Sequence, residues 1–314
     1  MGLGIINVLL YHWIAFSNLS KDNIFIIVLS EFNKFVFTEG FLFLSGFGLY
    51  YSFTKNSDTI TFWKKRALRV YLPYLIMTLP FLTYFDLFEN SSISDFLLDI
   101  TCLFFWKEGN KYGMWYIAIS IILYLIFPLV YKICILKDNR KTIERLLLLM
   151  LISLCIPVLI KLVDSNYYKI IKIGIDRVFI FLCGLAYGYV SHACRVSKNK
   201  LLIYNVAIIN LFVITYVVSL FADPIYNFLQ MVSKLVTIPT ICCIFNIMGN
   251  NKFMQLLNRE GHYTLELYIL HLFFYSLFSS LFVNVSQIEI MSMSILLALI
   301  ICKPVHITIN KVLL

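Results

Sequence analysis

The sequence predicts an all-α, polytopic integral membrane protein with about ten transmembrane helices. Hydrophobic residues make up 61% of the chain and charged residues only 14%, and the mean hydropathy is +0.85. A soluble domain is nearer half apolar and a quarter charged, so one globular core cannot bury this excess of apolar side chains. No polar block of domain size interrupts the apolar pattern. We therefore expect residues 1–314 to form a single membrane domain.

Apolar runs that can cross a bilayer recur along the whole chain. A crossing helix needs roughly 20 mainly apolar residues. The shorter run 94–106 carries Asp95 and Asp99 four residues apart, which indicates an interfacial or re-entrant helix rather than a span. The predicted spans are 2–17, 36–53, 70–88, 114–136, 145–163, 173–191, 201–221, 227–248, 263–283 and 288–311.

The basic residues between these runs predict that both termini face the cytoplasm. With the N-terminus inside, the inner loops and ends hold 17 of the 26 Lys and Arg residues, and the outer loops hold seven. Cytoplasmic loops of membrane proteins are enriched in these two residue types. The net charge of +9 therefore indicates loop topology and contact with membrane lipids, and not a nucleic-acid partner.

Cysteine spacing and missing motifs exclude several kinds of chemistry. None of the eight cysteines forms a C-x-x-C pair, and no His/Cys cluster has the spacing of a metal site, so no metal is expected. The sequence contains no G-x-S-x-G, no P-loop, no G-x-G-x-x-G and no H-E-x-x-H. The candidates are instead ionisable residues inside the apolar runs, because a charged side chain there is costly and is often functional.

His12 is the first of these candidates, because an imidazole titrates near neutrality and can act as a general base. A structural histidine that bonds a neighbouring helix is the alternative. Glu39 lies a few residues into the second span, at a depth similar to that of His12, so we expect its carboxylate to orient the His12 imidazole, as in a catalytic triad. His271 would lie near mid-bilayer, either as a second titratable group or bonded to a backbone carbonyl.

Lys65, Arg66 and Arg69 lie in the basic segment that follows the second span. Arg66 and Arg69 are three residues apart on one face of a helix. Two guanidinium groups placed in this way can bind phosphates bidentately, as in a phosphorylated cytoplasmic donor such as acyl-CoA. The alternative is a basic anchor for the third span that needs no ligand.

Three further residues lie near the outer ends of spans. Trp115 and Tyr116 begin the fourth span, as part of an aromatic belt or as a stacking platform for an acceptor. Arg177 lies just inside the sixth span, where snorkelling to the interface is the simplest interpretation. Lys234 and Glu266 are also within spans, and the sequence assigns them no role.

Taken together, six segments resemble the acyltransferase-3 family, the bacterial membrane O-acyltransferases of cell-surface glycans. Each segment alone is weak evidence for this family, whereas the ordered set together with ten predicted spans is fairly specific to it. The resemblance implies acyl transfer from cytoplasmic acyl-CoA, usually acetyl-CoA, to a hydroxyl of a cell-surface polysaccharide or lipid-linked glycan precursor. The resemblance runs over most of the chain, and the segments, in order, are GIINVLLYHW, GFLFLSGFGLYYS, FWKKRALRVYLPY, GMWYI, DRVFIFLCG and TLELYILH.

The same resemblance implies roles for individual residues and a place in the cell. His12 matches the essential histidine of the family, and Arg66 and Arg69 match arginines on the coenzyme A side. Trp115 matches a functionally important tryptophan. The protein would lie in the plasma or inner membrane, with acetyl-CoA as a co-substrate and no tightly bound cofactor. The other residues expected at the substrate sites are Lys65 for coenzyme A, and Tyr116, Arg177 and His271 for the acceptor.

The start of the chain departs from the family pattern. The family has a basic residue eleven positions before the histidine, and here that position is Met1. The first span is also short, since its 16 residues cover about 24 Å of a hydrocarbon core of about 30 Å. We therefore expect the natural start to lie upstream.

Two other functions compete with acyl transfer. One is a transporter or export component for a glycan or a small polar solute, which paired broken helices and inverted repeats would indicate. The sequence shows neither of these features. The other is a non-catalytic membrane partner, which the missing basic residue near the N-terminus suggests.

Overall fold

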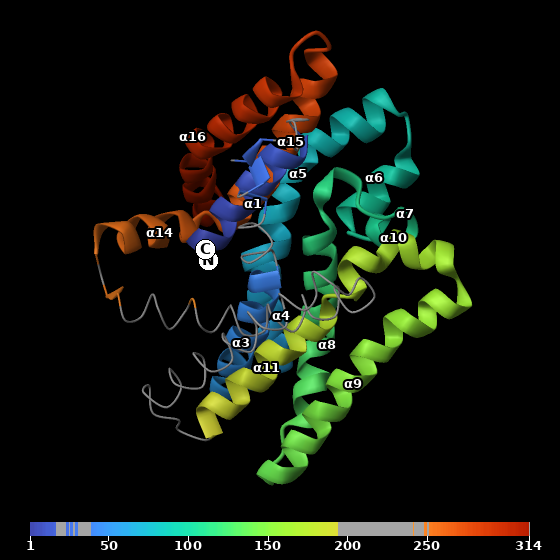
Figure 1. Ribbon diagram of the computed structural model, residues 1–314, viewed down its shortest axis with the longest axis vertical. Helices are drawn as coiled ribbons and strands as arrows, with labels where there is room; N and C mark the ends of the chain where they lie inside the picture. The colour runs from blue at the N-terminus through green and yellow to red at the C-terminus, as the bar shows by residue number, and fades with distance from the viewer. Residues whose placement is uncertain are drawn as a thin grey trace.

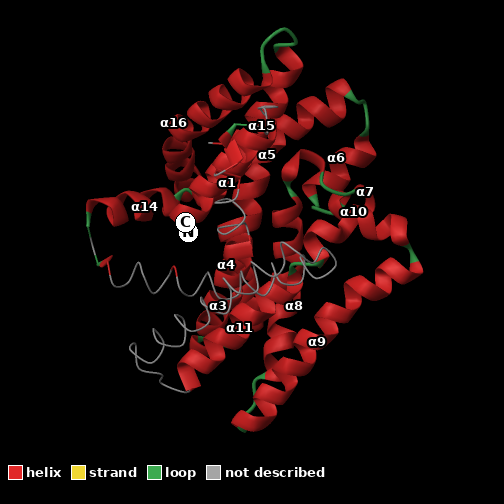
Figure 2. Ribbon diagram, viewed as in Figure 1, coloured by secondary structure: helices red, strands yellow, loops and turns green. Residues whose placement is uncertain are grey.

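The all-α prediction is confirmed for the part of the chain that the structure describes. The computed structural model describes residues 1–16, 39–193 and 251–313 continuously, with a few isolated positions at 23–30 and 241–249. Within these residues the regular elements are helices, and Figure 2 shows no strand among them. The predicted spans 201–221 and 227–248, with Lys234, fall outside the continuously described residues.

The described helices follow the predicted apolar runs but divide some of them. The π-helical turn Ala67–Tyr71 joins α4 (Thr59–Arg66) to α5 (Leu72–Leu82), and a second one, Thr83–Glu89, extends α5, so that Thr59–Glu89 is one helical stretch. The helices are α1 (Gly2–Phe16), α3 (Glu39–Lys55), α4 (Thr59–Arg66), α5 (Leu72–Leu82), α6 (Ile93–Ile100), α7 (Phe104–Glu108), α8 (Trp115–Cys134), α9 (Asn139–Val163), α10 (Ser165–Ile175), α11 (Val178–Ala193), α14 (Lys252–His262), α15 (Thr264–Leu281) and α16 (Gln287–Leu313).

Several of these helices can cross a membrane. α1 is apolar but shorter, in agreement with its short predicted span. The described helices support the prediction of a polytopic membrane protein, whereas the predicted count of ten spans is not confirmed. Among the described residues, five stretches are long and apolar enough to cross: Thr59–Glu89, Trp115–Cys134, Asn139–Val163, Thr264–Leu281 and Gln287–Leu313.

The described helices form two groups (Figure 1). In the first group α1 packs against α14, α15 and α16, and α15 packs along α16. In the second group α3 packs along α11, α9 packs against α10 and α11, and α8 contacts α3, α9 and α10. The groups meet where α5 and the turn Lys111–Gly113 contact α15. The helix that carries His12 therefore belongs to one group, and Glu39 belongs to the other.

A small residue brings α3 and α11 into close contact. A Cβ atom on Gly46 of α3 would lie only 2.1 Å from the backbone oxygen of Phe181 in α11, so no other residue fits there without a shift of the backbone. Small residues at such positions let membrane helices approach closely. This contact places Glu39, the first residue of α3, beside Arg177, which directly precedes α11.

Two predicted helices are divided by turns. The predicted helix 173–191 is interrupted at Asp176 and Arg177, where the backbone N–H of Arg177 donates to Gly174 O at 3.1 Å and closes a tight turn. The predicted short helix 94–106 is replaced by α6 and α7, and Cys102 between them has a left-handed φ of 58°. Both turns place polar side chains that a continuous helix would have directed elsewhere.

Candidate active site

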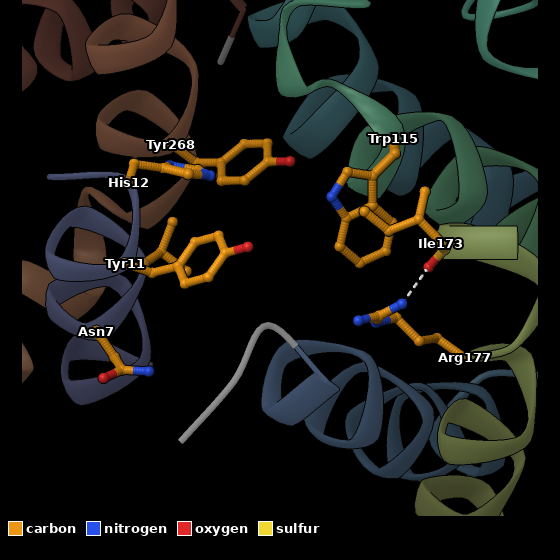
Figure 3. Close-up of a pocket in the computed structure, with 8 residues that line it drawn as sticks. Asn7, Tyr11, His12, Trp115, Ile173, Arg177 and Tyr268 are labelled. Carbon is orange, nitrogen blue, oxygen red and sulfur yellow. Dashed lines mark hydrogen bonds between the residues drawn. The ribbon is translucent and has the colours of Figure 1, made fainter. Parts of the chain in front are cut away.

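A cavity of about 70 Å³, here called the histidine cavity, lies between the two groups of helices (Figure 3). A space of this size holds several water molecules. Figure 3 shows His12, Tyr11 and Tyr268 on one side and Trp115 and Arg177 on the other, with open space between them. Three predicted site residues, from helices far apart in the sequence, are therefore brought together. The lining residues are Asn7, Val8, Tyr11, His12, Trp115, Ile173, Arg177 and Tyr268.

A second histidine, His271, is hydrogen-bonded to the ring of His12. Nδ1 of His12 lies 2.7 Å from Nε2 of His271, and Nδ1 of His271 lies 2.5 Å from the backbone oxygen of Leu267. A carbonyl oxygen only accepts hydrogen bonds, so Nδ1 of a neutral His271 carries the proton and its Nε2 is the acceptor. His12 then donates through Nδ1, and its Nε2 keeps a lone pair. Among the described residues no hydrogen bond reaches that Nε2.

The prediction that Glu39 orients His12 is wrong. Oε1 of Glu39 instead accepts a hydrogen bond of 3.0 Å from Nε of Arg177. The physical reason is charge: a guanidinium buried in an apolar bundle needs a counter-ion, and a neutral imidazole does not. A similar depth in the membrane does not determine which helix faces which.

His271 also differs from its expected role as a contact for the acceptor. Its side chain is fully buried, and both ring nitrogens are bonded, one to His12 and one to Leu267 O. The alternative prediction, a bond to a backbone carbonyl, is confirmed. His271 therefore contacts His12 and is not part of the cavity lining.

Arg177 and Trp115 form the opposite wall of the histidine cavity. The guanidinium centre of Arg177 lies 5.2 Å from the centroid of the Trp115 ring, within range of a cation–π interaction. Its Nη1 donates to Ile173 O at 2.7 Å, the dashed line in Figure 3. The Arg177 and Glu39 side chains are only 20% and 3% exposed, so this ion pair is largely buried. The arginine therefore turns toward Glu39 and does not snorkel to an interface.

Sequence reasoning missed two cavity residues on α1, Asn7 and Tyr11. They are four positions apart and share one face of the helix, whereas His12 lies five positions after Asn7 and one after Tyr11. The helical repeat counted back from His12 therefore does not identify them.

Tyr268, and not the predicted Tyr116, lines the histidine cavity. Tyr268, three residues before His271 on α15, lines the cavity and was not singled out. Tyr116, predicted as part of a stacking platform, is not part of the lining. Its ring lies behind those of Trp115 and Tyr268, with centroids 6.0 and 5.7 Å away. Of the predicted aromatic pair, Trp115 alone faces the cavity.

A larger cavity of about 340 Å³, here called the arginine cavity, lies beside the basic segment. The buried Nε of Arg66 has no hydrogen-bond partner among the described residues. The guanidinium centre lies 5.4 Å from the Phe62 ring and 5.9 Å from the Tyr124 ring. Lys65 and Arg69 are exposed and do not line this cavity. The lining residues are Trp63, Arg66, Ala67, Val70, Tyr71, Thr101, Ile121, Tyr124 and Leu125.

The backbone explains why the three basic residues separate. The chain becomes π-helical at Ala67, directly after Arg66, and stays so to Tyr71. A π-helical turn holds more residues than an α-helical turn, so the predicted shared face of Arg66 and Arg69 does not form as a single wall of the cavity.

Glu266, which had no predicted role, pairs with a histidine that sequence reasoning missed. Oε1 of Glu266 lies 2.6 Å from Nδ1 of His306 on α16. Nε2 of His306 lies 2.9 Å from Nδ2 of Asn310. The contact between Glu266 and His306 joins the start of α15 to the later part of α16. Among the described residues, no three His, Cys, Asp or Glu side chains are grouped as a metal site requires.

Comparison with known proteins assigns the chain to a family. The sequence model of the acyltransferase-3 family, described as an acyltransferase domain, matches residues 2–305. The chain belongs to the acyltransferase-3 family. No curated protein and no solved structure matches it. In a membrane acyltransferase the attacking group has to lose a proton, and the histidine cavity presents an imidazole nitrogen with a lone pair. This cavity is therefore the candidate active site of the acyltransferase.

Proposed function

We propose that this acyltransferase is an O-acetyltransferase that moves the acyl group of cytoplasmic acyl-CoA to a hydroxyl of a cell-surface polysaccharide or lipid-linked glycan precursor. The observation that carries the proposal is the chain of contacts from Leu267 O through His271 to His12, which ends at a cavity. The family gives the reaction class. Cytoplasmic termini rest on the bias of basic residues in the loops. A place in the plasma or inner membrane rests on the resemblance to the family.

His12 is the general base in this mechanism. Its Nε2 takes the proton of the acceptor hydroxyl while the hydroxyl oxygen attacks the thioester carbonyl. The C–O bond forms, the C–S bond breaks, and the proton passes from the imidazolium to the thiolate of coenzyme A. His271 accepts the hydrogen bond from Nδ1 throughout, so it holds the imidazole as the aspartate does in a triad, without an added negative charge.

The two cavities suit the two substrates. The histidine cavity, at about 70 Å³, fits a reacting hydroxyl and an acetyl group, so the rest of the glycan would lie outside it. The Trp115 ring offers a stacking surface for a sugar, and Arg177 offers hydrogen-bond donors. We assign the phosphates of coenzyme A to Lys65, Arg66 and Arg69, and the unpartnered Nε of Arg66 supports that side.

The test uses the purified protein in phospholipid vesicles with acetyl-CoA labelled in the acetyl group. The acceptors are a panel of hexoses, N-acetylhexosamines and deoxyhexoses, and the release of free coenzyme A is followed as well as label transfer. We expect His12→Ala to lose about 10²- to 10⁴-fold in rate, the range of general-base catalysis. His262→Ala on α14 is the matched control, because that histidine is exposed and outside both cavities.

Two outcomes would contradict the proposal. Label transfer that survives His12→Ala would exclude the general base. Wild-type protein that consumes no acetyl-CoA with any saccharide, but conducts a saccharide across the vesicle membrane, would favour a transporter.

A further inference from the structure

We propose that Lys111 is a positioning residue of the active site: it ties the turn Lys111–Gly113 to Asp86 and Asp99, and so fixes two walls of the histidine cavity. This inference rests on the proposed function, since it concerns how that active site is held in place.

Asp86, Asp99 and Lys111 form the ion-pair cluster on which the inference depends, here called the clamp. Nζ of Lys111 lies 2.7 Å from Oδ1 of Asp86 and 2.8 Å from Oδ2 of Asp99. The side chains are 18% exposed for Lys111, 0% for Asp86 and 11% for Asp99. The ammonium also lies 4.5 Å from the Phe104 ring centroid and 4.9 Å from that of Tyr112. Without Lys111, two poorly solvated carboxyl groups would face each other, which is strongly unfavourable.

The turn that Lys111 begins is unfavourable by itself. Tyr112 has a φ of 52° and a ψ of 16°, a left-handed conformation that is rare for a bulky side chain. Gly113 follows with a φ of 74°. Such a backbone persists only where its surroundings hold it. Here the clamp holds one side, and on the other side the Tyr112 ring packs 5.6 Å from the rings of Phe85 and Phe273.

Two hydrogen bonds connect this turn to the histidine cavity. The Tyr268 hydroxyl donates to Gly113 O at 2.5 Å, and the backbone N–H of Trp115 donates to Oδ1 of Asn110 at 3.2 Å. Tyr268 and Trp115 line the cavity on opposite sides in Figure 3. A Cβ atom on Gly113 would lie 2.6 Å from Cδ1 of Leu272, so the turn lies directly against α15. A shift of the turn therefore moves both walls at once.

The kinetic test compares Lys111→Met with Lys111→Arg and with the matched control Lys107→Met. Lys107 pairs with Glu108 on the same end of the molecule, but its side chain is 57% exposed. We expect Lys111→Met to lose about 10- to 100-fold in kcat/KM for the acceptor, because a displacement of about 1 Å in an active site has effects of that size. Lys111→Arg keeps the charge and should recover most of the rate. The control should retain it, and the KM for acetyl-CoA should change little in any variant.

A second readout needs no turnover and so separates this inference from the proposed function. Diethylpyrocarbonate modification of His12 is followed by mass spectrometry, with the exposed His262 as the internal reference. We expect faster modification of His12 in Lys111→Met than in the wild type or in Lys107→Met.

A triple variant, Asp86→Asn with Asp99→Asn and Lys111→Met, covers the case in which Lys111→Met fails to fold. It removes the clamp without leaving unpaired charges, so it should melt close to the wild type while His12 is still modified faster. A wild-type rate of His12 modification in the folded triple variant overturns the inference. Faster modification in a protein whose wild type transfers no acetyl group overturns the proposed function alone.

Discussion

The histidine cavity and the arginine cavity differ in how their polar groups are satisfied. In the histidine cavity, His12 is bonded to His271 and Arg177 to Glu39 and Ile173 O, so the walls are fixed before any substrate binds. In the arginine cavity, the buried Nε of Arg66 has no partner among the described residues. A buried donor without a partner costs free energy until a ligand supplies one. In the proposed function the first cavity is the site of acyl transfer, and the second binds the anionic donor.

The clamp connects these two regions. Asp99 lies near the end of α6, two residues before Thr101, which lines the arginine cavity. Lys111 leads through the turn to Trp115, which lines the histidine cavity. The difference between the cavities therefore concerns their polar groups, while the clamp joins chain segments that lead to both.

The largest expected effect is that of His12→Gln. Glutamine keeps a polar side chain but cannot act as a base, so kcat should fall by about 10²- to 10⁴-fold. Binding of acetyl-CoA, measured by isothermal titration calorimetry, should stay at the wild-type level because Arg66 is unchanged. Equal losses in acetyl-CoA binding and in kcat would contradict separate roles for the histidine cavity in catalysis and the arginine cavity in donor binding.

Replacement of His271 should have the next largest effect. His271→Phe fills the space but removes the acceptor for Nδ1 of His12, so the imidazole loses its fixed orientation. We expect kcat to fall by about 10- to 100-fold, as for other positional errors in an active site. His271→Asn retains an acceptor and should recover part of the loss in the same assay. If both variants transfer acetyl groups at the wild-type rate, His271 has no part in orienting the base.

Arg66→Ala should affect the donor alone. Hydrogen bonds to charged groups contribute about 1.5–3 kcal/mol, so the KM for acetyl-CoA should rise by about tenfold or more. The kcat at saturating acetyl-CoA should remain, because the histidine cavity is intact. Lys64→Ala, which removes an exposed cation of the same segment, is the control and should change KM far less. A fall in kcat at unchanged KM would place Arg66 in the chemical step.

The smallest expected effect is a pH dependence of stability that comes from the clamp. Burial raises the pKa of the Asp99 carboxyl to about 7, with Lys111 opposing the shift and Asp86 adding to it. The folded protein therefore holds a proton that the unfolded chain releases near its ordinary pKa of 3.8. This contribution to stability is therefore fully present below pH 3.8 and is lost as the pH rises through about 7.

Melting temperatures measured from about pH 5 to about pH 8 test this sign. The wild type should lose several degrees relative to Asp99→Asn as the pH rises. Asp95→Asn, on the same helix but outside the clamp, should follow the wild type. A difference between wild type and Asp99→Asn that grows in the opposite direction would contradict the buried state of this carboxyl.

Much of the fold and part of the site could be predicted from the sequence, because both follow from local features. Apolar runs of sufficient length predicted the helices. His12, Trp115 and Arg177 stood out as polar or aromatic residues at particular depths, and the structure brings them together.

The pairs of residues could not be predicted in the same way. His12 and His271 are separated by 259 positions, and periodicity gives the depth of each side chain but not the neighbour that its helix faces. For the same reason Glu39 was assigned to His12 when its partner is Arg177. The π-helical turn after Arg66 and the left-handed Tyr112 depend on tertiary contacts that no local pattern contains.

The tautomer of His12 tests its role as the general base most directly. Selective ¹⁵N labelling of histidine, with the His12 signals assigned by their loss in His12→Gln, reports which ring nitrogens carry protons. At neutral pH we expect His12 to be neutral, with a proton on Nδ1 and a lone pair on Nε2. A proton on Nε2 of His12, in either the other tautomer or an imidazolium, would contradict its role as the base.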